Sequence, residues 1–548
     1  MGVYLNPPTK EFTDRIAKKT FVDQTDLLAV VADKINDADH KYIAVSRPRR
    51  FGKTVDANMI IAFLEKNGDP AQFDGLKIAS HKKVCETHRG KYNVFFLDMS
   101  KNLIRADDIK GQIDYLEKLM LRELQDAFPD LDFSLYKFLN DMLAYACSVK
   151  KEQFIFIVDE WDAPLRLLRD RQEDQKRYLS WLNDLFKNQG YLALAYMTGI
   201  LPIKKYGDDS LMNMFDEYSM TDPGVFAPYM GFTGEDVEDL CKRHGEAIDD
   251  YKAWYDGYLM TMQRKSKDGI LCDDGIRRVF TSFHIYNPKS IAKAFSDGDI
   301  QDYWDRTGQF AALKDYIDTD RLGVRTAILE LMEGGRKEIN IRTFANDATR
   351  FKSGDDVLTM LVHLGYLTYD AKTKEAYIPN HELTLEFKDA MENASAEFAW
   401  LMGILRKSFS LLEATWRKDS DAVAKAVDEA HGHVCAPKDY NRELALLITI
   451  EFAYYAARPY YTMFPEAPTG LGYADVMFVP VKPDHPAMVI ELKWDKGVKS
   501  AIDQIRDKRY PARLENYAGN ILCIGISYEK TDSENPEYKK HTCVIEQM

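Results

Sequence analysis

Two short stretches of this chain carry residue types that can do chemistry. In the first, the apolar run Tyr42–Ser46 enters Arg47-Pro-Arg-Arg-Phe-Gly-Lys-Thr54. A loop that leads into a helix presents unpaired backbone N–H groups and the positive end of the helix dipole, which together suit a phosphate. Gly52 lets the backbone approach closely, Lys53 can reach the β- and γ-phosphates, and Thr54 can ligate Mg²⁺. The stretch predicts a nucleotide-phosphate site.

Acidic residues follow a second apolar run. Phe154–Val158 ends in Asp159 and Glu160. Asp159 would hold Mg²⁺ through its water shell, and Glu160 would orient or deprotonate the attacking water. Two solvated acids at a strand end would give the same pattern, but the order of the two features along the chain favours an ATP site. Thr198, which ends the run Leu192–Thr198, is either a polar sensor of the γ-phosphate or a structural threonine.

Arginines are prominent in and after the loop. Arg47 stands at the first glycine position of the pattern G-x-x-x-x-G-K-[ST]. With Arg49 and Arg50 it either supports bound phosphates or a neighbouring subunit's transition state, or it is a solvated loop charge. The arginines after the acidic pair are expected on a solvated helix face, with a role as arginine fingers as the alternative: Arg166, Arg169 and Arg171. The residues expected to contact the nucleotide are Arg47, Pro48, Arg49, Arg50, Phe51, Gly52, Lys53, Thr54, Asp159 and Thr198.

The second chemical stretch lies near the end of the sequence. Gly472-Tyr-Ala-Asp475 opens one apolar run, and another run leads into Glu491-Leu-Lys493. Side chains at positions i and i+2 of a strand point to the same face, so the glutamate and the lysine are expected together. If the two runs pair as a hairpin around 482–486, Asp475 approaches Glu491 at the same end of the sheet.

This arrangement suits phosphodiester hydrolysis. Such hydrolysis uses one or two divalent ions to activate water and to steady the leaving oxygen, with a cation beside the phosphate. Carboxylates are natural ligands of Mg²⁺. We therefore expect Asp475 and Glu491 to ligate the metal and Lys493 to polarise the water or the phosphate. A strand that ends in Glu-Leu-Lys is unremarkable when taken alone.

Two further features belong to this region. A predicted helix over Asn441–Ala453 offers Glu443 as a third metal ligand and Glu451 as a less favoured one, or either is a plain surface acid. From Lys493 to Arg513 basic residues outnumber acidic ones, although the whole chain has a formal net charge of −14. That local excess suits a phosphate backbone, and a solvated helix is the alternative.

The elements that must position these residues alternate along the chain. Strand-like and helix-like segments succeed one another from about residue 40 to 200, which predicts an α/β fold with a parallel sheet covered by helices. The predicted strands there are Tyr42–Ser46, Tyr92–Leu97, Phe154–Val158 and Leu192–Thr198. Near the end we expect strands at Ala474–Val481, Ala487–Leu492 and Asn520–Ser527 and a helix near Val498–Arg509.

At 548 residues the chain is too long for a single core, so several domains are expected. The expected division is a P-loop ATPase domain over 1–230, a helical region over 231–315, a winged-helix-like module over 316–385, a helical connector over 386–430 and a nuclease-like α/β domain over 431–548. The winged-helix prediction rests on helices that lead into a small hairpin, with a turn at Asp370–Lys374.

Bulk composition excludes several classes of protein. The seven cysteines are scattered without a CxxC pair, which argues against a zinc site or a disulfide framework and suits a reducing cytoplasm. The sequence has no apolar run of about 18 residues and no basic-then-apolar leader, which argues against a membrane span or a secretory signal. The acidic balance means that any nucleic-acid contact must come from local basic patches.

The first stretch resembles the R-P-R-R-F-G-K-[ST] signature of bacterial AAA-ATPase-like proteins that are fused to a PD-(D/E)XK nuclease domain. Phe21-Val-Asp-Gln-Thr25 resembles the family's V-D-K-T, Asp159-Glu-Trp-Asp-Ala-Pro164 resembles D-E-Y-D-x-P, and Thr198-Gly-Ile200 resembles T-G-V. Middle motifs resemble W-Y-N-G-Y, Y-N-P-x-S and Y-W-x-x-T-G, and we expect them to anchor the core or a domain interface: Trp254–Tyr258, Tyr286–Ser290 and Tyr303–Gly308.

The resemblance continues at the second stretch. Glu466–Asp475 resembles R-E-x-G-x-G-R-x-D, although Tyr473 stands where the family usually has arginine. Gln504–Tyr510 resembles the Q-I-x-x-K-x-Y helix that flanks the nuclease site, which implies a catalytic role for Gln504. The fold implied is a P-loop ATPase followed by a PD-(D/E)XK nuclease, with ATP and Mg²⁺ or Mn²⁺ as cofactors.

Together these observations predict a bacterial ATP-hydrolysing protein whose ATPase controls a nuclease domain, with DNA as the expected substrate. A regulatory ATP switch whose C-terminal domain binds nucleic acid or protein without cleaving it is the main alternative. Nucleotide as a structural ligand with negligible hydrolysis is a third. A homo-oligomer or a protein partner that docks on the winged-helix region is compatible with all three.

Overall fold

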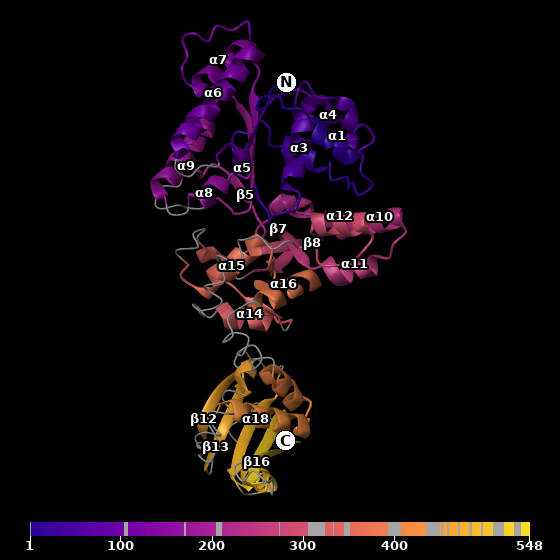
Figure 1. Cartoon of the computed structure of the whole chain (residues 1–548), viewed down its shortest axis with the longest axis vertical. Helices are drawn as coiled ribbons and strands as arrows, with labels where there is room; N and C mark the ends of the chain where they lie inside the picture. The colour runs from indigo at the N-terminus through magenta and orange to yellow at the C-terminus, as the bar shows by residue number, and fades with distance from the viewer. Residues whose placement is uncertain are drawn as a thin grey trace. The chain divides into compact units, whose positions relative to one another are not determined.

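The structure is a computed structural model in which the chain divides into two compact units, Met1–Asp389 and Ala390–Met548 (Figure 1). Each unit is described by itself. The described residues are 2–103, 108–168, 171–203, 211–272, 275–304, 324–332, 334–344, 351–392, 407–434, 450, 453–457, 460–469, 472–481, 485–494, 497–507, 514, 520–530 and 539–548. Within these residues no helix is long and apolar enough to cross a membrane.

A five-stranded parallel sheet forms the centre of the first unit. Its strands are β1 (Tyr42–Ser46), β2 (Asn93–Asp98), β3 (Phe154–Asp159), β4 (Leu192–Gly199) and β5 (Asp216–Tyr218), in the order β2-β3-β4-β1-β5. Three of them, β1, β3 and β4, are buried at every position, which explains their unbroken apolar runs. The prediction of a parallel α/β sheet is confirmed, and the carboxyl ends of β1, β3 and β4 meet at one edge.

Helices cover both faces of this sheet (Figure 1). The helices of this region are α1 (Lys10–Ile16), α2 (Leu27–Ala32), α3 (Lys53–Leu64), α4 (Lys82–His88), α5 (Met99–Asn102), α6 (Ile109–Ala127), α7 (Leu139–Lys150), α8 (Ala163–Leu167) and α9 (Gln172–Phe186). On one face, Leu116, Leu143 and Leu182 of α6, α7 and α9 share a core with Phe156 and Met197 of the sheet. In Figure 1, α1, α3 and α4 lie on the other side.

The next part of the unit corrects one prediction. Residues 231–315 were expected to be helical, and α10 (Gly234–His244), α11 (Ile248–Tyr255) and α12 (Pro288–Asp297) are helices. Between α11 and α12, however, β7 (Tyr258–Leu271) and β8 (Arg277–Tyr286) form a long antiparallel hairpin, and β6 (Phe232–Thr233) pairs with β8. Much of the outer half of the hairpin is exposed, so its sequence lacks the apolar alternation that identifies a half-buried strand.

A small α/β module completes the first unit. Its elements are α14 (Val324–Met332), β9 (Lys337–Glu338), α15 (Gly354–Leu364), β10 (Thr368–Asp370), β11 (Glu375–Tyr377) and α16 (His381–Glu392), with the sheet order β10-β11-β9. A capping box between Ser353 and Asp356 begins α15, and Gly365 ends it at φ +85°. The winged-helix interpretation and the five-part domain division stay predictions.

This module packs directly against the loop between β1 and α3. A Cβ added at Gly365 would lie 2.8 Å from the side chain of Pro48. The hydroxyl of Tyr258 donates to the Gly365 carbonyl at 2.6 Å, and its ring meets Phe51 edge-on with centroids 5.1 Å apart. The α15–β10 turn and the loop are therefore in contact through two independent side chains.

Parts of the three middle motifs meet around one buried acid, Glu382 of α16. Its carboxylate accepts hydrogen bonds from the Ser290 hydroxyl at 3.0 Å and from the Tyr303 backbone N–H at 2.8 Å. The Asn380 side chain donates to the Tyr255 carbonyl at 3.2 Å. These described residues of the motifs act as internal anchors that tie α11, α12 and α16 together.

The second unit is built on a five-stranded mixed sheet in the order β12-β13-β14-β15-β16. Its elements are α18 (Ser420–Val434), β12 (Tyr461–Thr469), β13 (Gly472–Pro480), β14 (Ala487–Trp494), α20 (Lys499–Asp507), β15 (Ile521–Lys530) and β16 (Lys539–Gln547). β14 and β15 are parallel, and the other neighbours are antiparallel. The three predicted strands and the predicted helix are confirmed within a few residues. Glu443 and Glu451 lie outside the described residues.

The two faces of this sheet carry different helices. Val423 and Val427 of α18 share a core with Phe478 and Ile490, whereas α20 packs on the opposite face. The α20 face is lined by the intervening residues of the strands, such as Val489. Side chains alternate between the two faces along a strand, so Asp475 of β13 and Glu491 of β14 belong to the α20 face.

Candidate functional site

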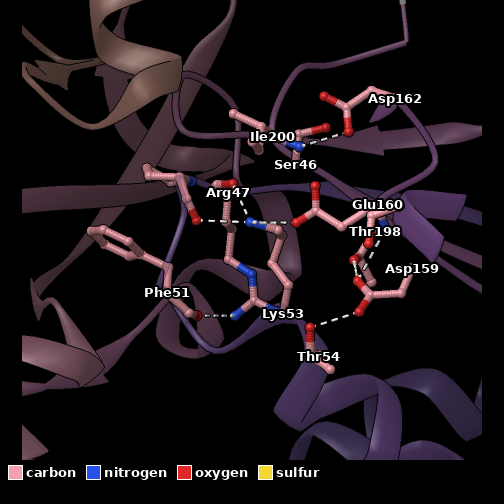
Figure 2. Close-up of polar contacts among 12 residues, drawn as sticks. Ser46, Arg47, Phe51, Lys53, Thr54, Asp159, Glu160, Asp162, Thr198 and Ile200 are labelled. Carbon is pink, nitrogen blue, oxygen red and sulfur yellow. Dashed lines mark hydrogen bonds and ion pairs between the residues drawn. The ribbon is translucent and has the colours of Figure 1, made fainter. Parts of the chain in front are cut away.

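The loop between β1 and α3 has a backbone that suits the predicted phosphate site (Figure 2). Arg50 and Gly52 adopt left-handed conformations, with φ of 72° and 84°. The second is at the N-cap of α3, where glycine adopts such an angle without strain. α3 begins at Lys53 without a side-chain cap, so its first N–H groups remain available to solvent or to an anion.

Lys53 points into the interior of the loop. Its ammonium donates to the carbonyls of Arg47 at 3.1 Å and of Pro48 at 2.9 Å, and it lies 3.7 Å from a carboxylate oxygen of Glu160. Burial lowers the pKa of Lys53, and the carboxylates of Glu160 and Asp159 act against that shift. The ammonium is thus held by two neutral carbonyls and one carboxylate. A phosphate oxygen can replace these contacts.

Arg47 is part of the loop's framework. Its guanidinium forms a buried ion pair with Asp56 of α3 and donates to the carbonyls of Phe51 at 3.2 Å and Tyr229 at 2.6 Å. The solvated-loop alternative is therefore wrong for Arg47, whose side chain is 2% exposed. Asp56 was not singled out in the sequence; the available signal was an acid on the largely apolar helix 55–64.

Asp159 joins the ends of three elements. The hydroxyl of Thr54, in the first turn of α3, donates to one of its carboxylate oxygens at 2.6 Å, and the hydroxyl of Thr198 in β4 donates to the other at 2.5 Å (Figure 2). Burial raises the pKa of Asp159, and these two hydroxyls act in the opposite direction. The structure thus brings Thr54, Asp159 and Thr198 together as the sequence analysis expected.

Glu160 lies between two cations. Its backbone is left-handed, with φ of 51°. One carboxylate oxygen lies 3.7 Å from Lys53 and the other accepts a hydrogen bond from Arg166 at 2.9 Å. Burial acts to raise the pKa of Glu160, but Lys53 and Arg166 outweigh it, so the pKa lies below its usual value. An ionised carboxylate facing the phosphate loop suits the orientation of a water molecule.

Arg166 corrects a second prediction. It was expected on a solvated helix face, yet its side chain is 20% exposed and pairs with both Glu160 and Asp162. Asp162 in turn accepts the backbone N–H groups of Ile200 at 3.3 Å and Leu201 at 3.2 Å. Sequence reasoning missed Asp162 as a site residue, although its spacing of four from Arg166 is that of a helical ion pair.

The remaining arginines near this site differ from one another. Arg49 is exposed and Arg50 is half-buried. Arg171 pairs with Asp174 at 2.6 Å, with 44% of its side chain exposed, as a solvated helix end would predict. Arg169 lies outside the described residues.

In the second unit, β13 and β14 form the predicted hairpin. Val476 is opposite Ile490 in the antiparallel register, so Asp475 lies one step further along, opposite Glu491. A carboxylate oxygen of Asp475 accepts the backbone N–H of Leu492 at 2.6 Å. The two acids are therefore brought to neighbouring strands at the same end of the hairpin.

Glu491 is closely surrounded. Its carboxylate accepts hydrogen bonds from Lys493 at 2.7 Å and from Gln504 of α20, and its side chain is 2% exposed. Gln504 reaches it because α20 covers this face of the sheet. Of the basic segment that follows, Arg506 pairs with Glu546, and several other members lie outside the described residues.

Comparison with known proteins identifies both regions. Residues 9–207 match the family described as "Predicted AAA-ATPase", and residues 447–535 match the PD-(D/E)XK nuclease superfamily. The chain carries an AAA-ATPase-like domain and a PD-(D/E)XK nuclease-superfamily domain. The resemblance noted in the sequence is thereby confirmed for both domains.

Two solved structures show more distant similarity to the chain. C. elegans PCH-2 is 11% identical over 42% of this chain and 46% of its own length, with a TM-score of 0.21. The chain thus spans less than half of that protein. The Aeropyrum pernix ORC2 protein, in ADPNP and ADP complexes, is 12% identical over 70% of this chain and 98% of its own length, with a TM-score of 0.29. A search of curated protein sequences gave no match.

The ATPase-like domain has residues that fit a magnesium–nucleotide complex. The Thr54 hydroxyl and the Asp159 carboxylate are already adjacent, and both are oxygen donors of the kind that Mg²⁺ takes directly or through water. Lys53 is buried, and its ammonium donates to the loop carbonyls of Arg47 and Pro48. The donor set therefore fits the ion and the phosphates that it would accompany.

The nuclease-superfamily domain fits a divalent ion less completely. Asp475 and Glu491 supply two carboxylates on facing strands, but the part of the chain that the structure describes contains no cluster of three or more acidic, histidine or cysteine ligands. The third predicted ligand, Glu443, is outside the described residues. The chemistry of the two acids suits Mg²⁺, with water filling its other positions.

Proposed function

We propose that this protein binds and hydrolyses ATP at the N-terminal site, and that ATP turnover controls Mg²⁺-dependent cleavage of DNA by the C-terminal domain. The observation that carries the proposal is the convergence of Lys53, Thr54, Asp159, Glu160 and Thr198 from α3, β3 and β4 and the loops at their ends. A structural nucleotide alone would not need an ionised Glu160 facing Lys53.

For ATP hydrolysis, Lys53 and the N–H groups at the start of α3 bind the phosphates, and Thr54 and Asp159 would hold Mg²⁺. The ion, when bound, neutralises charge that develops on the phosphate oxygens. Glu160 orients a water whose oxygen bonds to the γ-phosphorus as the bond from phosphorus to the bridging oxygen breaks. The bridging oxygen leaves with ADP, and the proton released by the attacking water passes by way of Glu160 to the inorganic phosphate that forms.

For DNA cleavage, Asp475 and Glu491 would hold Mg²⁺ or Mn²⁺, and Glu443 is the proposed third ligand. The ion would activate water and steady the leaving oxygen. Lys493 polarises that water or the scissile phosphate, and Gln504 holds Glu491 in orientation. The basic residues after Lys493 are the proposed contact for the phosphate backbone.

A second candidate function is an ATP-controlled switch that binds nucleic acid or protein without cutting. The cover of Glu491 favours it, because Lys493 and Gln504 both donate to the same carboxylate oxygen, Oε1, and so compete with a metal ion for that oxygen. In either case the proposed setting is the reducing cytoplasm of a bacterium. The segment 316–385 is the proposed place for a protein partner or a second copy.

The decisive experiment incubates the purified protein with single- and double-stranded DNA and RNA, with Mg²⁺ or Mn²⁺, and with or without ATP. The Glu160→Gln variant should retain ATP yet hydrolyse it about 10²- to 10³-fold more slowly, because an uncharged amide cannot accept the proton from water. If ATP turnover controls cleavage, this variant also changes the rate or extent of cutting. Tight nucleic-acid binding with no cleavage under every condition would select the switch instead.

A further inference from the structure

We propose that Arg166 is a positioning residue for ATP hydrolysis, holding Glu160 in place once a triphosphate has recruited Lys53. The inference rests on the ATPase activity proposed above. It adds to that site a residue that the sequence analysis expected on a solvated helix face. It follows from the way that the Glu160 carboxylate is shared between two cations and from the different anchoring of those cations.

The two cations occupy different oxygens of the same carboxylate. Lys53 is 3.7 Å from one oxygen, beyond hydrogen-bonding distance, whereas Arg166 donates to the other at 2.9 Å. Arg49 acts on Glu160 more weakly, as an exposed residue of the loop. Arg166 is therefore the closer partner even before a nucleotide enters.

A triphosphate must take the Lys53 ammonium away from this arrangement. Besides Glu160, that ammonium contacts only the neutral carbonyls of Arg47 and Pro48 among the hydrogen bonds and ion pairs of the described residues. Phosphate oxygens carry more charge than either carbonyl and attract an ammonium more strongly. When Lys53 turns to the phosphates, Glu160 loses one of its two cationic neighbours.

Arg166, by contrast, is anchored independently of the nucleotide. Its second nitrogen pairs with Asp162, whose side chain is 2% exposed. Asp162 also accepts N–H groups from Ile200 and Leu201, directly after β4. The guanidinium thus ties Glu160 to the ends of both β3 and β4, the same strands that supply Asp159 and Thr198.

This anchoring matters because Glu160 must hold a particular orientation. Its left-handed backbone directs the side chain away from the path that an extended strand would give it. A carboxylate oriented by a fixed guanidinium loses little freedom on the way to the transition state. Without Arg166, the Glu160 side chain would sample rotamers that do not orient the attacking water.

The test compares Arg166→Ala with a matched arginine variant, Arg177→Ala. Arg177 is 51% exposed and pairs with Asp174 on the surface of α9. Arg166→Ala should lower kcat for ATP about 10- to 100-fold, the loss expected for one charge-assisted hydrogen bond, with KM and ATP affinity changed less than about threefold. Arg166→Lys should restore part of kcat, and Arg177→Ala should match the wild type.

A double-mutant cycle separates positioning from simple structural support. If Arg166 acts through Glu160, adding Arg166→Ala to Glu160→Gln should cost little further rate. Three results would overturn the inference. They are rate losses that add in the double variant, a fall in ATP affinity as large as the fall in kcat, and a normal kcat in a folded Arg166→Ala protein. If Arg166→Ala fails to fold, Arg166→Lys and Arg166→Gln carry the same cycle.

The controls also separate this inference from the proposed function. A wild-type protein that turns over ATP in a Glu160-dependent way, with Arg166 variants unaffected, rejects only the role of Arg166. A wild-type protein with no ATP turnover rejects ATP hydrolysis itself, and the positioning role with it.

Discussion

The two candidate sites both place a lysine against a carboxylate, but by different means. Lys53 of α3 lies 3.7 Å from Glu160, which follows β3. Lys493 lies 2.7 Å from Glu491, two residues away on the same strand. The first contact exists only when distant segments assemble, whereas any strand with Glu-x-Lys can form the second. The N-terminal contact is therefore stronger evidence of a built site.

Exposure sharpens the difference. In the ATPase-like site the acid is the more exposed partner: 21% of the Glu160 side chain is exposed, compared with 3% of the Lys53 side chain. In the nuclease-superfamily site the order is reversed, with 2% for Glu491 against 15% for Lys493. A water can approach Glu160 more readily, whereas at Glu491 a metal ion would compete with Lys493 and Gln504 for the carboxylate oxygen Oε1.

The largest expected effect tests whether the second site cuts at all. Asp475→Asn should reduce Mg²⁺-dependent cleavage about 10³-fold, because a metal ligand contributes several kcal/mol to the transition state, while ATP turnover remains normal. Gel assays of DNA cleavage and phosphate release measure the two activities in one preparation. Asp421→Asn, an exposed acid of α18, is the matched control; equal cleavage by both variants would remove Asp475 from the site.

The next effect concerns the lysine that the fold brings to its acid. Lys53→Ala should weaken ATP binding about 100-fold, since each tenfold loss corresponds to about 1.4 kcal/mol and the lysine supplies a charge-assisted contact to phosphate. Calorimetric titration with ATP measures the change. Lys66→Ala, which breaks a surface pair with Glu152 at 2.9 Å, serves as control. Unchanged affinity in Lys53→Ala would show that the loop does not bind the phosphates.

A smaller effect separates the two interpretations of Thr198. Thr198→Val keeps the shape of the side chain but removes its hydrogen bond to Asp159, and should lower kcat about tenfold with little change in Tm. A structural threonine would give the opposite pattern, a lower Tm with kcat preserved. Thr13→Val, on the exposed side of α1, controls for the substitution itself.

A test of stability, not of activity, uses a buried acid that is held by hydrogen bonds instead of a close cation. Burial raises the pKa of Glu382 from 4.5 to about 7, whereas Lys53 and Arg166 keep that of Glu160 low. The folded state therefore holds the Glu382 proton more tightly than the unfolded state, and stability falls as pH rises from about 4.5 to 7.

Glu382→Gln should remove that part of the pH dependence. The difference in unfolding free energy between wild type and variant should change by about 2 to 3 kcal/mol across this window, measured by urea denaturation at pH 5 and pH 8. A difference that stays constant with pH would mean that Glu382 titrates normally.

How much of the ATPase-like site could be predicted depended on what each residue contacts. Asp159 and Glu160 were predictable because a buried run must end at the edge of a parallel sheet. The inward orientation of the Arg47 side chain could not be predicted. Its partner Asp56 lies one helical turn into α3, and only the folded loop brings the two side chains together. Arg166 was misjudged because Ala163–Leu167 is too short to present a solvated face.

The second unit shows similar limits. β13 and β14 were predictable from their apolar runs, and the register of the hairpin follows from those runs. β12 was missed because Pro465 and Pro468 interrupt it; prolines are tolerated there because β12 is at the edge of the sheet. The hairpin of the middle region was missed for a different reason, since its exposed outer half carries no core-facing pattern.

The contact between Gly365 and Pro48 places the α15–β10 turn directly against the loop between β1 and α3. The Pro48 side chain lies directly against Gly365, so a methyl group added at Gly365 would overlap it. A shift of the loop would therefore change its packing against the α15–β10 turn and against Tyr258. If a nucleotide binds to this loop as proposed, any movement of Pro48 would reach the turn that directly follows α15.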